Sequence, residues 1–158
     1  MATWNDLERE SPELAETGRR LLTRSGTGEA LLATVRGDAA PRIHPVYAEV
    51  VDGHLVTFVI EGSAKAADLA ADGRYALHVH VDPTAPDEFA IRGRGRQVTD
   101  EDLRRRAVKA WAFDASEGYR LVELEIEHAL LGRRPTADDW PPVYTSWRSD
   151  STDRVSRA

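Results

Sequence analysis

The chain has 158 residues, a formal net charge of −6 and a hydrophobic fraction of 41%, values typical of one acidic globular domain. A net acidic domain is a poor default binder of nucleic acid, and no apolar run reaches the roughly 18 residues that a membrane span needs. We therefore expect neither a nucleic-acid nor a membrane partner. The absence of cysteine excludes disulfides, thiolate metal ligands and cysteine nucleophiles, and it fits a cytoplasmic protein.

The first predicted element is a helix that begins at Ser11-Pro12. Serine is a favoured N-cap, and proline is favoured at the first helical position. Leucines follow at helical spacing, and the Ser-Gly-Thr-Gly run at 25–28 ends the helix.

Alternating or apolar segments after this helix predict a series of strands. Pro41 and Pro45 indicate an edge position or a bulge for the second strand, and Asp52-Gly53 is a strong hairpin signal. Short helices are expected at 63–71 and, after a capping box at Thr99, from there to about Phe113. The predicted strands are 30–36, 42–51, 55–60, 75–81, 88–98 and 122–130.

Strands dominate this order, hairpin-length turns join them, and helices lie at the connections. The pattern predicts an α+β fold, mainly antiparallel, in the form of a small six-stranded β-barrel with peripheral helices. One domain is expected over residues 1–148, and residues 149–158 are expected to form a disordered tail.

The segment 58–69 carries the most functional information. An apolar strand runs into Gly62-Ser63, and a helix opens at Ala64. Helix N-termini have unsatisfied N–H donors and partial positive charge, which suit phosphate, and Lys65 would add a cation. The alternative interpretation is a plain strand-to-helix turn, in which Ser63 caps the helix and Lys65 is solvated.

Three arginines, Arg92, Arg94 and Arg96, share one face of a predicted strand by period-two alternation. We favour their pairing with an acidic set on a neighbouring strand, because opposite charges across strands are a routine stabilising arrangement. The alternative partner is the anionic tail of a cofactor. The acidic set is Glu123, Glu125 and Glu127.

Two further residue pairs allow more than one interpretation. His78 and His80 have workable metal geometry, but no third ligand joins them in sequence, which favours a polar strand face or a dimer contact. Trp140 and Trp147 stand in a Pro- and Asp-rich stretch. They are either core plugs or aromatic caps that reach a cofactor across a dimer.

Taken together, the motifs resemble the pyridoxamine 5'-phosphate oxidase-like, FMN-binding split-barrel superfamily. The similarity covers roughly Leu14 to Leu131, and the motifs stand in the family's order. They are Ala33-Thr34-Val35-Arg36, Pro41-Arg42-Ile43-His44-Pro45-Val46, Asp52-Gly53-His54-Leu55, Ser63-Ala64-Lys65-Ala66-Ala67-Asp68-Leu69 and Arg74-Tyr75-Ala76-Leu77-His78.

The resemblance implies a split barrel and a homodimer, with the cofactor in a groove at the subunit interface. The Ser63/Lys65 loop would hold the phosphate, and two strand segments would edge the flavin ring. FMN is the expected cofactor, and relatives also use the 8-hydroxy-5-deazaflavin coenzyme or haem. The implied cofactor-binding residues are Arg42, His44, Pro45, Val46, Val59, Ile60, Glu61, Gly62, Ser63 and Lys65.

The first functional hypothesis is therefore a flavin-type oxidoreductase that passes hydride between FMN or deazaflavin and a small organic substrate. The cofactor supplies that chemistry, so no catalytic acid, base or metal ligand is assigned. A haem-binding or haem-handling barrel is the second hypothesis, and a cofactor-less dimeric binding module is the third. The predicted phosphate site at Ser63 and Lys65 distinguishes the first hypothesis from the other two, because neither a haem protein nor a cofactor-less module needs such a site.

Overall fold

The computed structural model describes residues 1–150, so most of the tail expected at 149–158 lies outside the described part. The helices are α1 (Trp4–Glu10), α2 (Pro12–Leu22), α3 (Ala64–Ala71) and α4 (Glu101–Ala110). The strands are β1 (Glu29–Val35), β2 (Pro41–Tyr47), β3 (Glu49–Val51), β4 (His54–Ile60), β5 (Arg74–Val79), β6 (Glu88–Gln97), β7 (Tyr119–Arg133) and β8 (Val143–Arg148).

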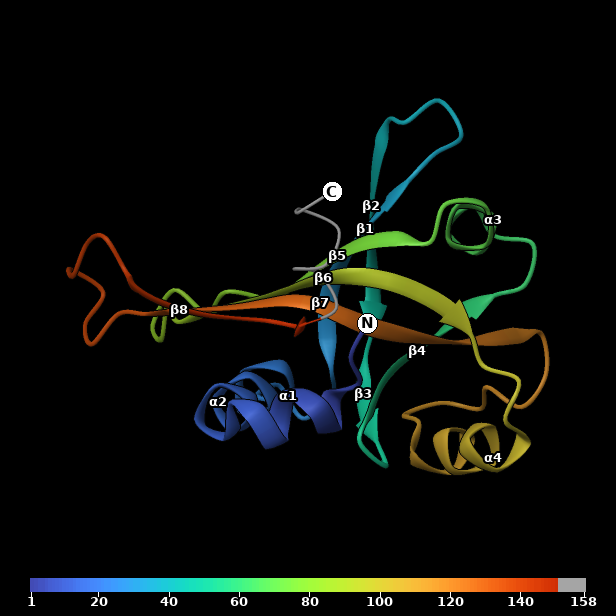
Figure 1. Ribbon diagram of the computed structural model, residues 1–158, viewed down its shortest axis with the longest axis horizontal. Helices are drawn as coiled ribbons and strands as arrows, with labels where there is room; N and C mark the ends of the chain where they lie inside the picture. The colour runs from blue at the N-terminus through green and yellow to red at the C-terminus, as the bar shows by residue number, and fades with distance from the viewer. Residues whose placement is uncertain (151–158) are drawn as a thin grey trace.

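The strands form one antiparallel sheet that curls into an open barrel (Figure 1). Its order is β2-β1-β5-β6-β7-β4-β3, and β8 also pairs with β7. The 15-residue β7 pairs with β6 along one edge, while its other edge carries β4 at the beginning and β8 at the end. The predicted α+β split barrel with peripheral helices is confirmed, and the described sheet has eight strands rather than six.

The two additional strands have separate causes. The predicted strand 42–51 is divided at Ala48, whose N–H donates to the Gly28 carbonyl at 2.8 Å as the last contact with the β1 side. Residues 49–51 then pair with β4 as β3. Strand β8 was not predicted, because the Pro- and Asp-rich loop before it carries turn signals that hide a strand paired only with β7.

The helices also differ from the prediction in two places, at residues 4–10 and at the end of α4. A capping box, in which Thr3 and Asp6 bond each other's backbone N–H groups, begins the unpredicted α1. Helix α4 ends at Ala110 rather than Phe113, because Trp111 has an extended backbone and turns into a cluster of aromatic rings. The ring centroids of Trp111 and Phe58 lie 4.9 Å apart.

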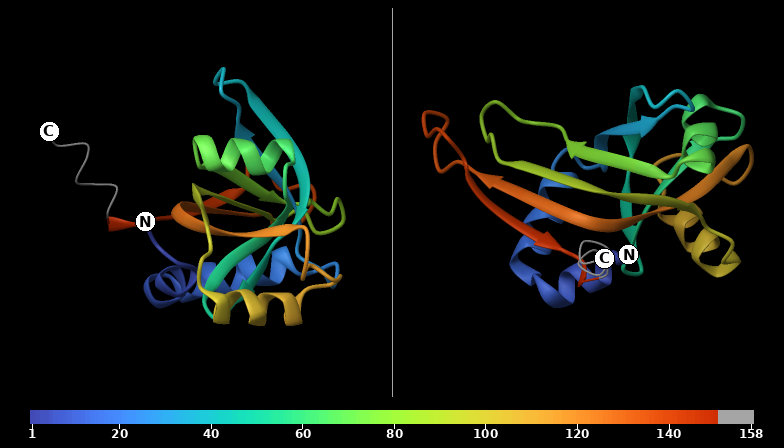
Figure 2. Two further views of the ribbon diagram at one scale, coloured as in Figure 1. Left: turned by 90° about the vertical axis from the view of Figure 1, so that its right-hand side faces the viewer. Right: turned by 45° about the horizontal axis from the view of Figure 1, so that its top comes forward.

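The main core lies between α1, α2 and the concave face of the sheet. Trp4 is fully buried, and its ring meets Phe89 edge-on at 6.0 Å. Helix α2 approaches β6 so closely at Gly18 that an added Cβ would lie 2.4 Å from the Phe89 ring. Figure 2 shows the resulting arrangement, with the β1–β2 hairpin beside α3 and the long β7–β8 ladder extending away from both.

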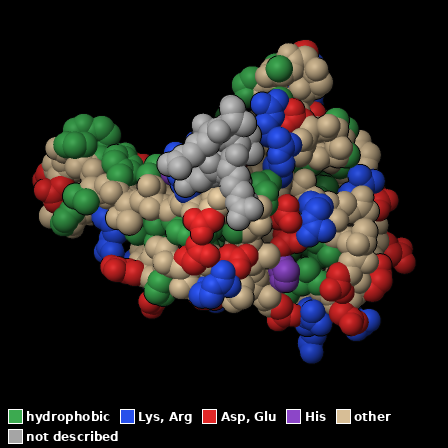
Figure 3. Space-filling model, viewed as in Figure 1, with side chains coloured by type: hydrophobic (Ala, Val, Ile, Leu, Met, Phe, Trp, Pro, Cys, Tyr) green, Lys and Arg blue, Asp and Glu red, His purple; other side chains and the backbone are tan. Residues whose placement is uncertain are grey.

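The β7–β8 ladder separates the two tryptophans of the Pro- and Asp-rich stretch. Trp147 packs against the core, and its indole N–H donates to Glu10 at 3.1 Å. Trp140 is 74% exposed at the tip, where other hydrophobic side chains also gather on the surface (Figure 3). Trp147 therefore acts as a core plug, and Trp140 does not.

Candidate functional site

The turn from β4 into α3 has the form that the sequence predicts. Gly62 adopts a positive φ of 76°, a conformation that glycine reaches without strain. The Ser63 N–H donates to the Ile60 carbonyl, and the Ser63 hydroxyl accepts from the Ala66 N–H at 3.3 Å, which caps the helix. Ser63 therefore caps the helix. The plain-turn interpretation also requires that Lys65 is fully solvated.

Lys65 is not a fully solvated surface cation. Its side chain is half-buried, and this burial lowers the pKa of its ammonium group. Within residues 1–150, no hydrogen bond or ion pair joins Lys65 to another side chain. Partial burial of an ammonium group without a partner has a desolvation cost, which a bound anion would offset.

Beside this turn, a buried carboxylate joins α3 to the β1–β2 hairpin. Asp68 accepts a hydrogen bond from the Thr34 hydroxyl at 2.8 Å, and its carboxylate lies 3.2 Å from Arg42 Nε in an ion pair without hydrogen-bond alignment. His44 Nε2 lies 3.1 Å from the same Thr34 hydroxyl. Both Asp68 and Thr34 are buried. We call these residues and Lys65 the seat.

The electrostatics of His44 show how closely the basic groups of the seat lie. Partial burial lowers the pKa of His44, and the positive charges of Lys65 and Arg42 lower it further. Asp68 acts in the opposite direction but is the smallest influence. Two cations therefore face one carboxylate, so the seat has surplus positive charge and can hold an anion such as a phosphate group.

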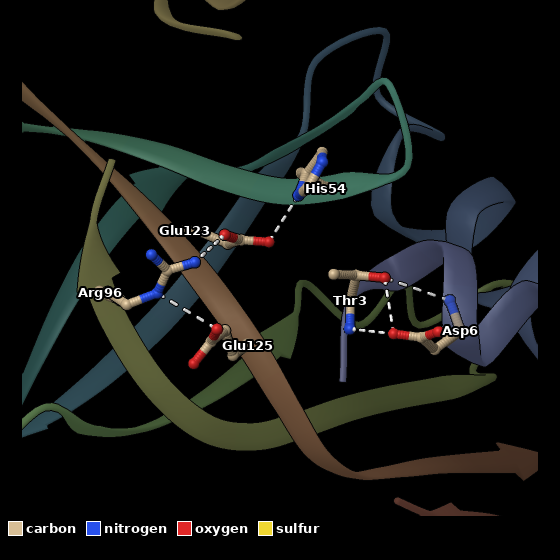
Figure 4. A network of polar contacts seen from close by, with 6 residues as sticks. All are labelled: Thr3, Asp6, His54, Arg96, Glu123 and Glu125. Carbon is tan, nitrogen blue, oxygen red and sulfur yellow. Dashed lines mark hydrogen bonds and ion pairs between the residues drawn. The ribbon is translucent and has the colours of Figure 1, made fainter. Parts of the chain in front are cut away.

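A second polar network lies elsewhere on the sheet and is complete in itself (Figure 4). Glu123 accepts from Arg96 Nη2 at 3.0 Å and lies 2.6 Å from His54 Nδ1. Arg96 also donates to Glu125 at 3.2 Å. The predicted pairing of the arginine strand with the acidic strand is confirmed for Arg96.

The other two arginines of the strand do not meet carboxylates of that acidic set. Arg94 donates to the Asp72 carbonyl at 3.0 Å, and Arg92 stands opposite His128. For Arg92 the reason is a register shift between Arg92 and Gly93, which leaves Glu127 outside the ladder, whereas Arg94 stands opposite Glu125 but binds the Asp72 carbonyl instead.

A groove of about 380 Å³ lies on the face of the sheet that points away from the main core. Adjacent residues of a strand point to opposite faces of the sheet. In β1 the Ala33 side chain lines the groove, and the next side chain, Thr34, belongs to the seat. The groove and the seat are therefore separate surfaces. Apart from Ala33, the groove is lined by Leu31, Ile43, Ala76, Leu77, His78, Ala90, Ile91, Arg92, His128 and Leu130.

Comparison with known families matches residues 17–131 to the model described as Pyridoxamine 5'-phosphate oxidase, which is more than half of the chain. The chain belongs to this family. A search of the curated proteins found no match. The superfamily resemblance read from the motifs is thereby confirmed.

Several solved structures share the fold of this oxidase-family chain. A haem binding protein from Mycobacterium smegmatis is 16% identical with a TM-score of 0.61; the match covers 81% of this chain and 57% of that one. General Stress Protein 26 from Bacillus anthracis is 16% identical with a TM-score of 0.58, covering 82% and 98%. The haem storage protein HutZ from Vibrio cholerae is 14% identical with a TM-score of 0.54, covering 77% and 90%. Identities this low establish the fold alone.

The oxidase-family resemblance implies ten cofactor-binding residues, and the structure brings some of them together. Arg42 and His44 meet in the network around Asp68, and Ser63 and Lys65 stand at the start of the same helix. Pro45 alternates onto the opposite face of β2 and is exposed.

The remaining expected residues differ in how deeply they are buried. Val59 is fully buried, so only its backbone could reach a ligand. Val46 packs against the core, whereas Ile60 is 56% exposed directly before the turn. Glu61 and Gly62 are also exposed.

Sequence reasoning missed Thr34 and Asp68 as members of the site. Asp68 follows Lys65 by three residues and so shares a face of α3 with it. The signal that could have revealed Asp68 is the place of an acidic residue beside Ala66 and Leu69, which are apolar and buried. Within residues 1–150 there is no group of three or more potential metal ligands, and no helix is long and apolar enough to cross a membrane.

Proposed function

We propose that this chain is a flavin-type oxidoreductase that binds FMN with its phosphate in the seat. The observation that carries the proposal is Lys65, a half-buried cation without a partner in the described chain, beside Arg42 and at the start of α3. A phosphate there would receive two positive charges and N–H donors from the helix start. The residues present fit the phosphate group of FMN.

The neighbouring residues have positioning roles in this proposal. Asp68 holds Arg42 by an ion pair and is itself fixed by the Thr34 hydroxyl, so the guanidinium is oriented before an anion arrives. The exposed Ile60, three residues before Ser63, offers apolar surface to a flat ring. Bound FMN would supply the hydride chemistry, while the protein orients the ring toward a small organic substrate.

FMN is favoured over the 8-hydroxy-5-deazaflavin coenzyme, which stays the alternative flavin. A longer anionic tail needs free arginines, and two members of the arginine strand already have partners. Arg96 binds Glu123 and Glu125, and Arg94 binds the Asp72 carbonyl. Only Arg92 of that set has no hydrogen bond or ion pair within residues 1–150.

We also propose a homodimer with the cofactor at the subunit interface, as the family resemblance implies, and a cytoplasmic location, which fits the absence of cysteine. Exposed apolar side chains support a second copy, because surfaces of this kind are commonly covered in assemblies. Ile43 is 68% exposed on β2, and Val143 is 68% exposed near the tip of the β7–β8 ladder.

Haem is the second candidate ligand. Two structural neighbours carry haem-related names, and two imidazoles, those of His78 and His128, line the apolar groove. Imidazole is a common axial ligand of haem iron, and an apolar groove suits a macrocycle. Binding there would leave the seat unused.

The test is a visible absorption spectrum of the purified protein, followed by titrations with FMN, deazaflavin and haemin. We expect FMN to bind, and we expect Lys65→Ala to weaken binding about ten- to hundredfold, with partial recovery in Lys65→Arg. Lys109→Ala, which removes the only other lysine of the sequence, is the matched control. Unchanged FMN affinity in Lys65→Ala would contradict the seat, and a Soret band with no flavin uptake would favour haem.

A further inference from the structure

Helix α3 has two flanks, and only one of them belongs to the seat. On the flank that faces β1, Asp68 accepts a hydrogen bond from Thr34. The other flank faces the end of β6 (Figure 1). There the helix and the strand approach so closely that a Cβ added at Gly95 would lie 2.9 Å from Leu69 Cδ2. This second flank has no role in the proposed FMN site.

A pocket of about 300 Å³ lies on the second flank, between α3, β6 and β7. Ala66, Leu69 and Val122 contribute apolar surface to its lining, and Gln97 and Arg120 contribute polar groups. The volume is at the lower end of the range of roughly 300–1,000 Å³ that is typical of small-molecule sites. The pocket therefore has room for a small ligand with an apolar part and a polar part.

The strand register brings the two polar residues together. Gln97 stands opposite Val122, and Arg120 precedes Val122 by two residues on β7. Residues two apart on a strand share a face, so Arg120 is the diagonal neighbour of Gln97 on the face that carries the core residue Val122. A guanidinium and an amide are thus placed side by side at the edge of an apolar surface.

Arg120 is a half-buried cation that has no hydrogen bond or ion pair within residues 1–150. Its partner across the ladder is the buried Val59, and Glu61, two residues further along, forms no ion pair with it. Partial burial of a charged group without a partner has a desolvation cost, which a bound anion would offset.

The other half-buried arginines of the described chain show the usual arrangement. Each of them binds a backbone carbonyl or pairs with a carboxylate. They are Arg24, Arg42, Arg104 and Arg134. Arg120 differs from all four, and it is also the one that lines this pocket. The difference indicates that its partner is a ligand rather than a group of the protein.

We propose that this pocket binds a small organic carboxylate. The carboxylate lies on Arg120 and Gln97, and the apolar body lies on Ala66, Leu69 and Val122. A guanidinium group presents two parallel N–H donors, which match the two oxygens of a carboxylate. A single unpaired cation also suits a single negative charge, whereas the seat, with Lys65 and Arg42, suits a phosphate group.

This proposal does not depend on the proposed FMN site, because the pocket and the seat lie on opposite flanks of α3. Lys65→Ala changes the seat and leaves Arg120 in place, whereas Arg120→Gln changes the pocket and leaves Lys65 in place. FMN binding that fails in the native chain would therefore leave the carboxylate proposal standing, and the reverse also holds.

The test titrates the full chain with three probes that share one branched alkyl group, namely isovalerate, isoamyl alcohol and isoamylamine. We expect isovalerate to bind at least about tenfold more tightly than the alcohol, because a charge-assisted hydrogen bond contributes about that factor, and the amine to bind least. Arg120→Gln should abolish this preference. The matched control is Arg20→Gln, since Arg20 is an exposed arginine of α2 without a partner in residues 1–150.

NMR locates the bound probe. Isovalerate should shift the signals of the Arg120 Nε–H and of the Gln97 side-chain amide, and the same shifts should persist in Lys65→Ala. A second variant tests the pocket while retaining Arg120. Ala70→Glu adds a carboxylate at an exposed position of α3 that lines the pocket, and it should weaken isovalerate binding at least about tenfold.

A purely structural role of Arg120 predicts a different result. Arg120→Gln removes a half-buried charge without a partner, so the melting temperature of the ligand-free variant should not fall. Isovalerate should raise the melting temperature of the native chain but not that of the variant. Equal binding of the three probes, no binding, binding that Arg120→Gln leaves unaltered, or a lower melting temperature of ligand-free Arg120→Gln would overturn the proposal.

Discussion

The two buried carboxylates Asp68, on α3, and Glu123, on β7, lie in polar networks that differ in how fully their charged groups are paired. Asp68 accepts from Thr34 and pairs with Arg42, while Lys65 nearby has no partner within residues 1–150. Glu123 binds a histidine and an arginine, and that arginine also binds a second carboxylate (Figure 4). In the first network one cation has no partner, whereas in the second both carboxylates have one.

This difference shows that a buried carboxylate does not by itself indicate a ligand site. The Glu123 network connects β4, β6 and β7, and its polar groups satisfy one another, so it contributes to stability. The Asp68 network leaves positive charge unneutralised at the start of a helix, and such charge favours an anion. Stability and binding should therefore respond differently to substitutions in the two networks.

The largest expected effect on stability is that of Glu123→Ala. The side chain is 4% exposed and holds two partners, so its loss removes both contacts and leaves a cavity. His54 and Arg96 are 35% and 60% exposed and can turn to water, which limits the cost. We expect the free energy of unfolding in urea to fall by about 2 kcal/mol.

The same variant should leave FMN affinity unchanged, because the Glu123 network does not contact the seat. Glu127→Ala, at the bulge of the same strand, is the control and should change stability by less than about 0.5 kcal/mol. Loss of FMN binding in folded Glu123→Ala would show that the two networks are coupled, and would undo the contrast between them.

Asp68→Asn should give a smaller loss of stability together with a gain in affinity. The amide still accepts from Thr34, but Arg42 loses its ion-pair partner, so the free energy of unfolding should fall by about 1 kcal/mol. Removing the one carboxylate of the seat leaves Arg42 and Lys65 unopposed. FMN affinity, measured by fluorescence quenching, should rise severalfold.

A fall in FMN affinity for Asp68→Asn would be equally informative. It would mean that the ion pair orients Arg42, and that this orientation matters more to the phosphate than the charge of Asp68. The variant Asp72→Asn, on the surface beyond the end of the same helix, controls for a general change in charge.

Arg96→Gln should have a smaller effect still. Its guanidinium binds Glu123 and Glu125, but the side chain is 60% exposed and solvent screens the interaction. We expect a loss of about 0.5 kcal/mol in urea unfolding, reduced further in high salt. A loss as large as that of Glu123→Ala would mean that Arg96, and not the packing of Glu123, supports this part of the sheet.

The contrast between the networks also explains how much of the site the sequence could reveal. The turn from Gly62 to Ser63 and the start of α3 follow from local preferences for positive φ and for helix capping, so they were predictable. The meeting of Asp68 with Thr34 was not, because it joins residues 34 positions apart through tertiary packing.

The same distinction applies to the sheet. Period-two alternation placed Arg96 with the acidic strand, but it carried no information about the register shift that puts Arg92 opposite His128. The family resemblance supplied the split barrel as a whole. Strand β8 was missed because its position depends on β7 and not on its own composition.

The smallest expected effect is a pH dependence of stability that arises from His44. Burial and the charges of Lys65 and Arg42 lower the pKa of His44, so the unfolded chain takes up a proton at a higher pH than the folded chain. This contribution to stability is complete above the unfolded pKa of about 6.5 and is lost as the pH falls below it. Urea unfolding of His44→Gln should therefore depend less on pH between 7.5 and 5.5.

Bound FMN should change this behaviour in a defined direction, because a phosphate beside His44 favours its protonated form. An NMR titration of the His44 ring should give a higher midpoint with FMN than without it. Inorganic phosphate should act in the same direction, whereas riboflavin, which has the ring but no phosphate, should not. An identical midpoint in all of these conditions would place the phosphate away from the seat, and the surplus charge around Asp68 would then need a different ligand.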